Sequence, residues 1–381
     1  MIIQSKRVWI ANQFIEAQIE IKNGKIARVY SYNEKKYDKD YGDLRLVPGF
    51  IDIHTHGAYG FDTNDAEEDG LRYWMKHIPE EGVTSILPTT VTQVPEVLAP
   101  ALKNVAKVVK EGYEGAEILG VHFEGPYLDM KYKGAQPPEA IAVPTVEQFK
   151  YYQECANGLI KYITIAPEHD SDYELIRYMT QNGVVASMGH SSATYEEALM
   201  GIANGCTSMT HVYNGMTPYH HRNLGLVGTA FRVRDIYGEV ICDGCHSTFA
   251  ALNNFFMTKG RDYSIMISDS LRPKGCSPDG EYTLGGHPIV IGADGLARIK
   301  GTDTIAGSTL RINKGLKNLV ENAMVPFDYA INSCTINPAR CLGVDDRKGR
   351  LRAGYDADIV VLDNDYEVVE TYCKGIAMLN K

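Results

Sequence analysis

Between residues 49 and 270 the chain repeats one pattern, in which a short apolar run is followed by a longer stretch of mixed polarity. The eight runs are FIDIHTH (50–56), VTSILPTT (83–90), EILGVHFEG (117–125), YITIAPE (162–168), VVASMGHS (184–191), TSMTHVYN (207–214), EVICDG (239–244) and SIMISDS (264–270). Three of the intervening stretches begin with capping-box spacing, at Thr145–Gln148, Ser171–Glu174 and Thr194–Glu197, which predicts helices there.

Strands that alternate with helices in this way predict an α/β protein built from right-handed βαβ units around a parallel sheet. Eight such units favour a closed (β/α)8 TIM barrel. An open doubly wound sheet is the alternative architecture for the same alternation.

The two ends of the chain carry a different pattern. Residues 2–30 alternate like short strands, with a hairpin signal at KNGK (22–25), and residues 349–376 return to strands and turns. Within the central part, residues 280–300 predict a β-hairpin and residues 308–323 predict a helix.

These patterns predict two domains. Because both termini have strand character, we expect them to pair into one small β-sandwich domain, made from residues 1–48 and 345–381. The barrel would then occupy residues 49–344.

Charge and cysteine usage narrow the classes of function. The 381 residues carry a net charge of −10 and contain no basic run, which argues against nucleic acid or an anionic membrane as partner. No apolar stretch approaches the roughly 18 residues of a membrane span, and the first residues lack the pattern of a secretory signal. Eight cysteines without such a signal indicate reduced thiols, so we expect a cytoplasmic protein.

Polar residues of unusual type fall where the predicted strands end. In chain order they are His54 and His56, Glu124, His190, His211, His246 and Asp269. The active site of a parallel barrel lies at the carboxyl ends of its strands, so these side chains should converge in one bowl. Imidazoles and carboxylates that converge are typical ligands of a divalent transition metal that keeps an open position for water.

This set of residues indicates hydrolysis. A bound divalent ion lowers the pKa of water to about 7 and can polarise a carbonyl group. Asp269 could take the proton of the attacking water and return it to a leaving nitrogen. The arrangement therefore suits cleavage of an amide or a related C–N bond.

Several motifs resemble one known family. VPGFIDIHTHG (47–57) is similar to the opening strand of the metal-dependent amidohydrolase superfamily. The motifs HFEGP (122–126), MGHSSA (188–193), THVYNGM (210–216), HHR (220–222), DGCH (243–246), SDS (268–270), EYTLGG (281–286) and AGSTL (306–310) resemble the N-acetylglucosamine-6-phosphate deacetylase family, in family order. This resemblance implies a TIM barrel with a small β-domain from both termini. The implied reaction converts N-acetyl-D-glucosamine 6-phosphate into D-glucosamine 6-phosphate and acetate.

The resemblance also implies the roles of individual residues. Glu124, His190 and His211 match the ligands of the principal metal, and His54 with His56 forms a complete HxH pair that allows a second ion. Zinc or iron, one or two ions per subunit, is the implied cofactor. Asp269 matches the catalytic acid and base, and His246 matches a histidine that contacts substrate and polarises the reacting group. His122 is expected to be structural, and His77, His169 and His287 are expected to have no catalytic part.

Substrate-binding positions follow from the same motifs. The matching residues are Ala135, Gln136, Asn214, Gly215, Arg222, His246, Ile305, Ala306 and Gly307. In the family the arginine reaches in from the second subunit of a homodimer, so Arg222 is expected to complete the partner's site. The ligand is an amino-sugar phosphate, a small molecule.

Departures from the family pattern leave the substrate open. Gln136 stands where the family usually has a histidine on the phosphate side, Ser270 replaces an alanine, and Asn223 begins a segment that is usually Glu-Pro-Gly. N-acetylgalactosamine 6-phosphate or an unphosphorylated sugar is therefore an alternative substrate. A further alternative is an amidohydrolase that acts on a cyclic amide or a nucleobase, but Glu124 stands where such enzymes rely on a carboxylated lysine. The last alternative is a sugar-sensing barrel without activity, but such a protein should have an incomplete ligand set, and this set is intact.

One motif points in another direction. Cys242, Cys245 and His246 form a Cys-x-x-Cys-His sequence, which can mark a haem attachment, a zinc knuckle or a dithiol. Because the same histidine belongs to the DGxH motif, we interpret the spacing as incidental. Cys242 should lie in a buried strand, and Cys245 should fill space beside the site.

Overall fold

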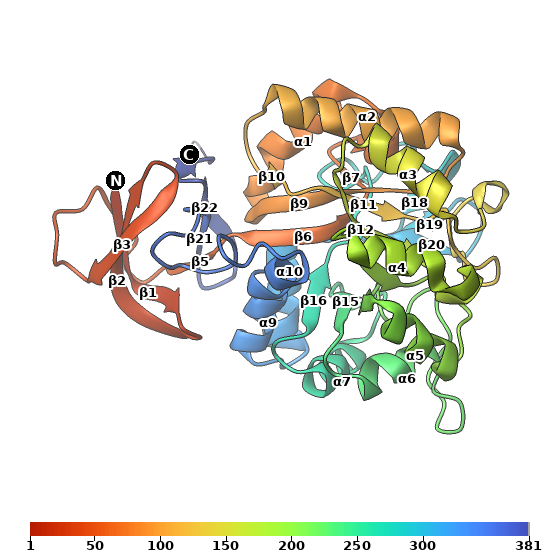
Figure 1. Ribbon diagram of the computed structural model, residues 1–381. Helices are drawn as coiled ribbons and strands as arrows, with labels where there is room; N and C mark the ends of the chain where they lie inside the picture. The colour runs from red at the N-terminus through yellow and green to blue at the C-terminus, as the bar shows by residue number, and fades with distance from the viewer. Residues whose placement is uncertain (380–381) are drawn as a thin grey trace.

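The computed structural model describes residues 1–379, and its centre is a nearly closed barrel of eight parallel strands in sequence order (Figure 1). The strands are β6 (Phe50–Thr55), β9 (Val83–Thr90), β11 (Val121–Glu124), β12 (Ile160–Ile165), β13 (Val185–Met188), β14 (Cys206–Met209), β15 (Tyr237–Ile241) and β16 (Ser264–Ile267). Each of the eight apolar runs overlaps one of them. Where the eighth strand returns to the first, the Asp269 amide donates to the carbonyl of His54 (2.9 Å). The TIM barrel is confirmed, and the open sheet is excluded.

Helices pack outside the barrel. They are α1 (Glu68–His77), α2 (Pro95–Glu111), α3 (Val146–Cys155), α4 (Glu174–Gln181), α5 (Tyr195–Asn204), α6 (Gly225–Arg232), α7 (Phe249–Lys259), α8 (Ile312–Lys317), α9 (Phe327–Ser333) and α10 (Ile336–Cys341). The side chains of Thr145 and Thr194 cap α3 and α5 as predicted. The predicted cap at Ser171 is wrong, because the carboxylate of Asp170 accepts the free amides at the start of α4 instead. No helix in residues 1–379 is long and apolar enough to cross a membrane.

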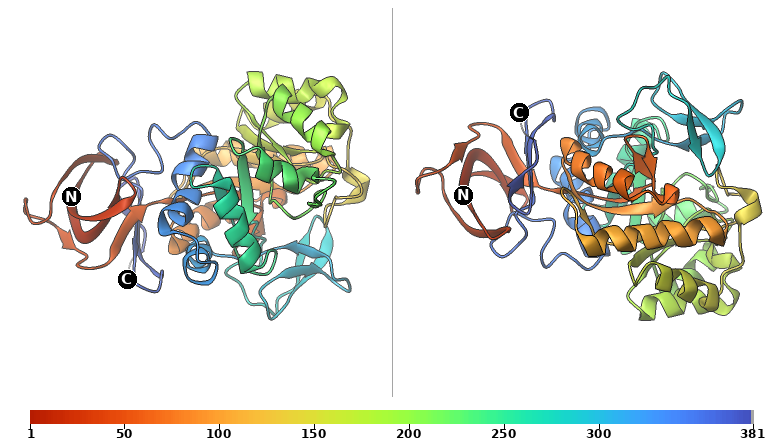
Figure 2. Two further views of the ribbon diagram at one scale, coloured as in Figure 1. Left: turned by 90° about the horizontal axis from the view of Figure 1, so that it is seen from below. Right: turned by 90° about the horizontal axis from the view of Figure 1, so that it is seen from above.

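Strands from both ends of the chain form a separate antiparallel-rich sheet. They are β1 (Ile2–Ile10), β2 (Gln13–Lys22), β3 (Lys25–Ser31), β4 (Lys39–Asp40), β5 (Arg45–Pro48), β21 (Ile359–Leu362), β22 (Val368–Cys373) and β23 (Ile376–Ala377). The pairing is continuous, because β21 joins β5, and the sheet curls over its own apolar core (Figure 2). The expected small β-domain from both termini is therefore present. The exact boundaries, at residues 48 and 344, stay a prediction.

A third sheet lies against the carboxyl end of the barrel (Figure 2). It consists of β17 (Tyr282–Leu284), β18 (His287–Ile291), β19 (Ala297–Ile299) and β20 (Ile305–Gly307). The segment predicted as a hairpin, residues 280–300, therefore forms the first three strands of a four-stranded sheet. The helix predicted from residue 308 begins only at Ile312, because Ser308 still pairs with Ser270 in extended conformation. Its second half, Asn318–Asn322, is a π-helix.

Candidate metal centre and active site

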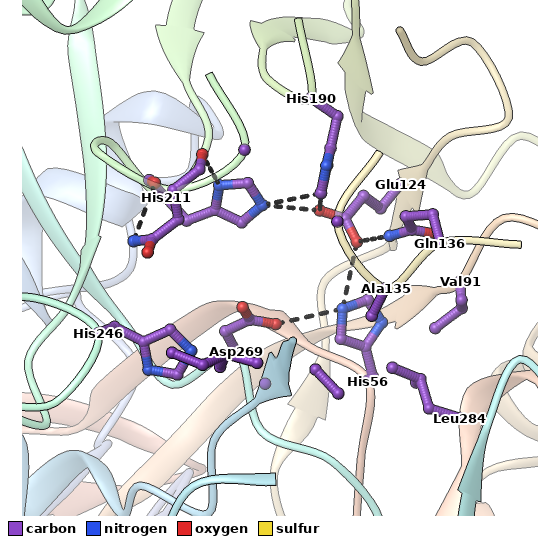
Figure 3. A pocket seen from close by; sticks show the side chains of 16 residues that line it. His56, Val91, Glu124, Ala135, Gln136, His190, His211, His246, Asp269 and Leu284 are labelled. Carbon is purple, nitrogen blue, oxygen red and sulfur yellow. Dashed lines mark hydrogen bonds and ion pairs between the residues drawn. The ribbon is translucent and has the colours of Figure 1, made fainter. Parts of the chain in front are cut away.

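A cavity of about 150 Å³ opens at the carboxyl ends of the barrel strands (Figure 3). Its lining residues are His56, Val91, Glu124, Gly134, Ala135, Gln136, His190, His211, Asn214, Gly215, His246, Asp269, Leu284, Ile305, Ala306 and Gly307. Most residues that the sequence singled out thus lie around one space. Of the predicted site residues only His54 and Arg222 are absent from this lining.

The first group of candidate metal ligands is Glu124, His190 and His211. Oε1 of Glu124 lies 3.3 Å from Nε2 of His190 and 3.2 Å from Nε2 of His211, and the two Nε2 atoms are 3.1 Å apart. Nδ1–H of His190 donates to the carbonyl of Tyr132 (2.8 Å), and Nδ1–H of His211 donates to the carbonyl of Asn214 (3.1 Å). Both Nε2 atoms therefore present lone pairs to a carboxylate oxygen.

Three acceptor atoms that face one another at this distance repel unless a cation lies among them. Two imidazole ligands of a tetrahedral zinc ion would place their nitrogens about 3.3 Å apart, close to the spacing seen here. Oε1 of Glu124 is also buried without a hydrogen-bond partner. The residues of this group therefore fit a divalent metal ion.

A second group, His54, His56 and Asp269, adjoins the first. Oδ1 of Asp269 lies 3.6 Å from Nε2 of His54 and 3.3 Å from Nε2 of His56. Nε2 of His56 is also 3.3 Å from Oε2 of Glu124, so the carboxylate of Glu124 faces both groups. The buried Nε2 atom of His54 has no hydrogen-bond partner. The arrangement can accommodate one ion or two.

Backbone geometry turns several of these side chains inward. His190, His211 and Asp269 have positive φ angles of 47°, 28° and 47°. Residues other than glycine and asparagine rarely adopt this left-handed conformation, and it is concentrated at functional sites. At the end of each strand the turn directs the side chain into the barrel mouth instead of along the strand.

Burial and the neighbouring charges shift the pKa values of these side chains in opposite directions, and the charges outweigh burial. Burial alone would lower the pKa of His56, but its contacts with Asp269 and Glu124 outweigh burial and raise the pKa to about 9. For His54 the charges of Glu124 and Asp269 outweigh burial and raise the pKa well above its usual value. Burial would raise the carboxyl pKa of Glu124 and Asp269, but the surrounding histidines lower both. The cavity therefore favours positive charge, which a metal ion would supply.

Two buried residues, Glu239 and His122, lie deeper in the barrel than the candidate metal ligands. Nδ1–H of His54 donates to Oε2 of Glu239 (3.0 Å), which leaves Nε2 of His54 free toward the cavity. His122 donates from Nδ1 to the carbonyl of Ile53 (3.1 Å) and accepts at Nε2 from Thr164 (2.8 Å). Burial lowers the pKa of His122 well below its usual value, so this histidine is neutral. Sequence reasoning missed Glu239, although a glutamate at the start of the apolar run EVICDG was a usable signal.

A model of the amidohydrolase family matches residues 45–378. This chain belongs to the amidohydrolase family. N-acetylglucosamine-6-phosphate deacetylase of Bacillus subtilis (strain 168) is 40% identical over 393 residues, with 100% of this chain and 98% of the relative covered. N-acetylgalactosamine-6-phosphate deacetylase of Escherichia coli O157:H7 is 33% identical, with 94% and 93% covered. The crystal structure of N-acetyl-D-glucosamine-6-phosphate deacetylase from Mycobacterium smegmatis has a TM-score of 0.94 at 30% identity, with 100% of both chains covered.

The predicted resemblance to N-acetylglucosamine-6-phosphate deacetylases is therefore confirmed for this amidohydrolase. The matching segment includes the whole barrel and the strands that return to the small β-domain. Four solved structures of such deacetylases agree with this chain over at least 98% of its length.

The motif around Cys242 and Cys245 can now be interpreted in this amidohydrolase. Cys242 is fully buried as expected, but it lies one residue after the end of β15 and not in the strand. Cys245 is exposed and does not fill space beside the cavity. Neither thiol forms a disulfide bond. His246 instead turns toward the cavity, and its Nδ1–H donates to Oδ2 of Asp243 (2.6 Å), which leaves Nε2 available to a ligand.

Gln136 lies on the metal side of the cavity. Its Nε2 donates to Oε2 of Glu124 (2.7 Å), and its Oε1 accepts from the backbone amide of Thr92 (2.8 Å). Both ends of the amide are thus hydrogen-bonded within the protein. A contact with substrate stays a prediction, but the hydrogen bonds connect this residue to a candidate metal ligand (Figure 3).

Arg222 lies outside the cavity of its own chain. The residue is exposed, and its Nη1 donates to Nε2 of the neighbouring His221 (2.8 Å). Its expected contact with a phosphate in a partner subunit stays a prediction.

Proposed function

We propose that this amidohydrolase removes the N-acetyl group of N-acetyl-D-glucosamine 6-phosphate and releases D-glucosamine 6-phosphate and acetate. The observation that carries the proposal is the convergence of Glu124, His190, His211 and Asp269 in one cavity, in a chain that is 40% identical over its full length to a relative named for that activity. The role would place the protein in cytoplasmic catabolism and recycling of amino sugars.

The metal ligands follow from the two side-chain groups. Glu124, His190 and His211 would hold the principal ion, and His54 and His56 with Asp269 would hold a second one. Zinc and iron suit these imidazole and carboxylate donors. When bound, such an ion supplies a more acidic water and polarises the acetyl carbonyl.

Asp269 would transfer the proton. Because its pKa is lowered, the carboxylate is ionised at neutral pH and can accept the proton of the water that attacks the carbonyl carbon. The same proton then passes to the amide nitrogen, the C–N bond breaks, and acetate and a free amine leave. His246, held through Nδ1 by Asp243, would direct Nε2 at the acetyl group.

The remaining lining residues would bind the sugar. Ala135, Asn214 and Gly215 lie on one side of the cavity, and Ile305, Ala306 and Gly307 come from β20 of the overlying sheet. Gln136 adjoins them. Arg222 of a second subunit in a homodimer would provide the positive charge for the 6-phosphate.

The 33% identity to an N-acetylgalactosamine-6-phosphate deacetylase favours one alternative substrate, the galactose epimer. The test is acetate release from a panel of N-acetylhexosamines, each with and without the 6-phosphate, after metal analysis of the purified protein. We expect the highest kcat/KM for N-acetylglucosamine 6-phosphate, loss of turnover on chelation, and recovery with zinc or iron. An equal or higher kcat/KM for an unphosphorylated sugar would refute the substrate, and full activity of the metal-free protein would refute the mechanism.

A further inference from the structure

A second cavity, of about 280 Å³, lies where the small β-domain meets the barrel. It is at the amino-terminal ends of the barrel strands, opposite the active-site mouth, because Pro48 precedes β6 and Arg261 precedes β16. The turn between β1 and β2, the helices α9 and α10, and residues 349–352 complete its walls. Both helices stand between the small sheet and the barrel strands (Figure 1).

The walls of this junction cavity carry an excess of positive charge. Four arginines, Arg261, Arg340, Arg350 and Arg352, line it together with a single carboxylate, Asp262. Asp262 accepts from Arg261 (3.2 Å) and from Arg340 (3.2 Å). The guanidinium groups of the other two arginines have no ion pair and no hydrogen bond to residues 1–379. In a chain of net charge −10, this local concentration of cations is a feature that an anion would stabilise.

Two neutral side chains in the same walls also lack partners. Trp9 is 8% exposed and Asn332 is 5% exposed, and both line the cavity. Within the described part of the chain, neither side chain forms a hydrogen bond. An indole N–H can only donate, and a side-chain amide can donate as well as accept. The walls of the cavity therefore contain four side chains with hydrogen-bond donors, two of them charged, that donate to no acceptor within residues 1–379.

We propose that the junction cavity binds a small anion that carries a phosphate group, either free or as a monoester. The arginine fork matches phosphate oxygens and keeps its charge at every physiological pH. The volume lies just below the usual range of small-molecule sites, roughly 300–1,000 Å³, which limits the ligand to about the size of a sugar phosphate. Because its contacts come from both domains, the bound anion joins the small β-domain to the barrel.

The chain provides its own probe for this binding. It has two tryptophans, and Trp74 is 1% exposed in the barrel core, so a ligand in the junction cavity reports through Trp9. The metal-loaded protein is titrated at constant ionic strength with inorganic phosphate and with ribose 5-phosphate, against ribose and chloride. We expect a saturable change in tryptophan fluorescence and, since the ligand binds only the folded state, a rise in Tm.

Variants separate this cavity from the active site. Arg350→Gln combined with Arg352→Gln removes two charged donors and should weaken binding at least tenfold. Arg28→Gln, which changes an exposed arginine on β3 outside the cavity, should bind like the parent. Trp9→Phe should lose the fluorescence signal but keep the Tm shift. Arg222→Ala should leave the fluorescence titration unchanged.

The titrations also decide which ligand is meant and whether the proposal stands. Preference for inorganic phosphate or for ribose 5-phosphate assigns the free or the esterified form. No saturable change in the parent protein, or equal affinity in the double variant, overturns the proposal. Neither result depends on the deacetylase activity, because no turnover is measured.

Discussion

At Gln136, one side-chain amide connects the backbone of Thr92 to the carboxylate of Glu124. Replacement by leucine keeps the approximate size and removes both hydrogen bonds. Outer partners of metal ligands typically contribute 10–100-fold in metal affinity, so Gln136→Leu should release metal to a competing chelator at a concentration about 10–100-fold lower. Gln93→Leu is the matched control, because within residues 1–379 the Gln93 side chain hydrogen-bonds to the backbone of Gly285 and Val94 and to no candidate metal ligand. Unchanged metal retention in Gln136→Leu would place the residue with the substrate instead.

Asp269 is the residue at which proton transfer can be tested without a change of shape. The amide of an asparagine side chain could not accept a proton here, and general acid–base catalysis contributes about 10²–10⁴-fold, so Asp269→Asn should lower kcat by at least 10²-fold. Metal analysis of the same protein should still find an ion, since Glu124, His190 and His211 remain. An Asp269→Asn enzyme within a few-fold of the parent kcat would assign the proton transfer to another group.

The sequence could predict which residues converge here, since strand ends of a parallel barrel share one rim. It could not predict the hydrogen bonds that other residues form with these candidate metal ligands. The hydrogen bonds of Gln136 and of Glu239 depend on groups that are distant in sequence, the backbone amide of Thr92 and the imidazole of His54. From residue type alone, Gln136 is only a neutral substitute for histidine. Its position between Thr92 and Glu124 becomes visible only in the folded chain.

Among the elements, the short strand β10 (Glu117–Ile118) has an unusual role, because its carboxylate pairs with the segment before β21. Arg347 donates twice to Glu117 (3.0 Å each), and the buried ammonium of Lys348 lies 2.6 Å from it. Burial would raise the pKa of Glu117, but these two cations outweigh burial and lower it to about 2. The pairing therefore stabilises the folded state only while Glu117 is ionised.

This lowered pKa predicts a pH-dependent cost for Glu117→Gln. The folded pKa lies below the unfolded value of about 4.3, so the stabilisation is complete above that value and is lost as the pH falls toward 2. Hydrogen bonds to charged groups contribute about 1.5–3 kcal/mol. We expect the urea midpoint of Glu117→Gln to fall clearly at pH 7, and the difference from the parent to shrink by pH 3. Glu114→Gln is the control, because the Glu114 side chain is 77% exposed. An equal difference at both pH values would contradict the ion pairing.

The elements also show where local signals are sufficient. The caps of Thr145 and Thr194 were predictable, because the capping side chain, the amide that it accepts from and the apolar residues that follow are all close in sequence. The predicted cap at Ser171 is wrong for a local reason. Asp170 is one residue earlier, and its carboxylate is a stronger acceptor for the amides at the start of α4. The late start of α8 has a distant cause. Ser308 is held by the backbone of Ser268 and Ser270, which no pattern within residues 308–323 reveals.

At the scale of the whole molecule, the barrel and the terminal sheet were predictable because each rests on a repeated pattern, apolar runs in one case and strand alternation in the other. The junction cavity was not, because Trp9, Asn332 and Arg350 come together only when the termini pack under the barrel. The proposed binding of the 6-phosphate by Arg222 likewise depends on how parts of the protein come together. The side chain of Arg222 is exposed and, within residues 1–379, hydrogen-bonds only to His221, so its own chain gives it no role.

A homodimer in which Arg222 enters the partner's cavity would explain this exposure, and mixed dimers test it. A dimer of one Arg222→Ala subunit and one Asp269→Asn subunit has one site that lacks both groups and one that has both, since the arginine comes from across a two-fold interface. Random pairing makes half of the dimers mixed. Co-expression with two different tags should therefore restore roughly a quarter of the parent activity, although each variant alone is nearly inactive at low substrate concentration. If purified mixed dimers were no more active than the two variants apart, Arg222 would act within its own chain or not at all.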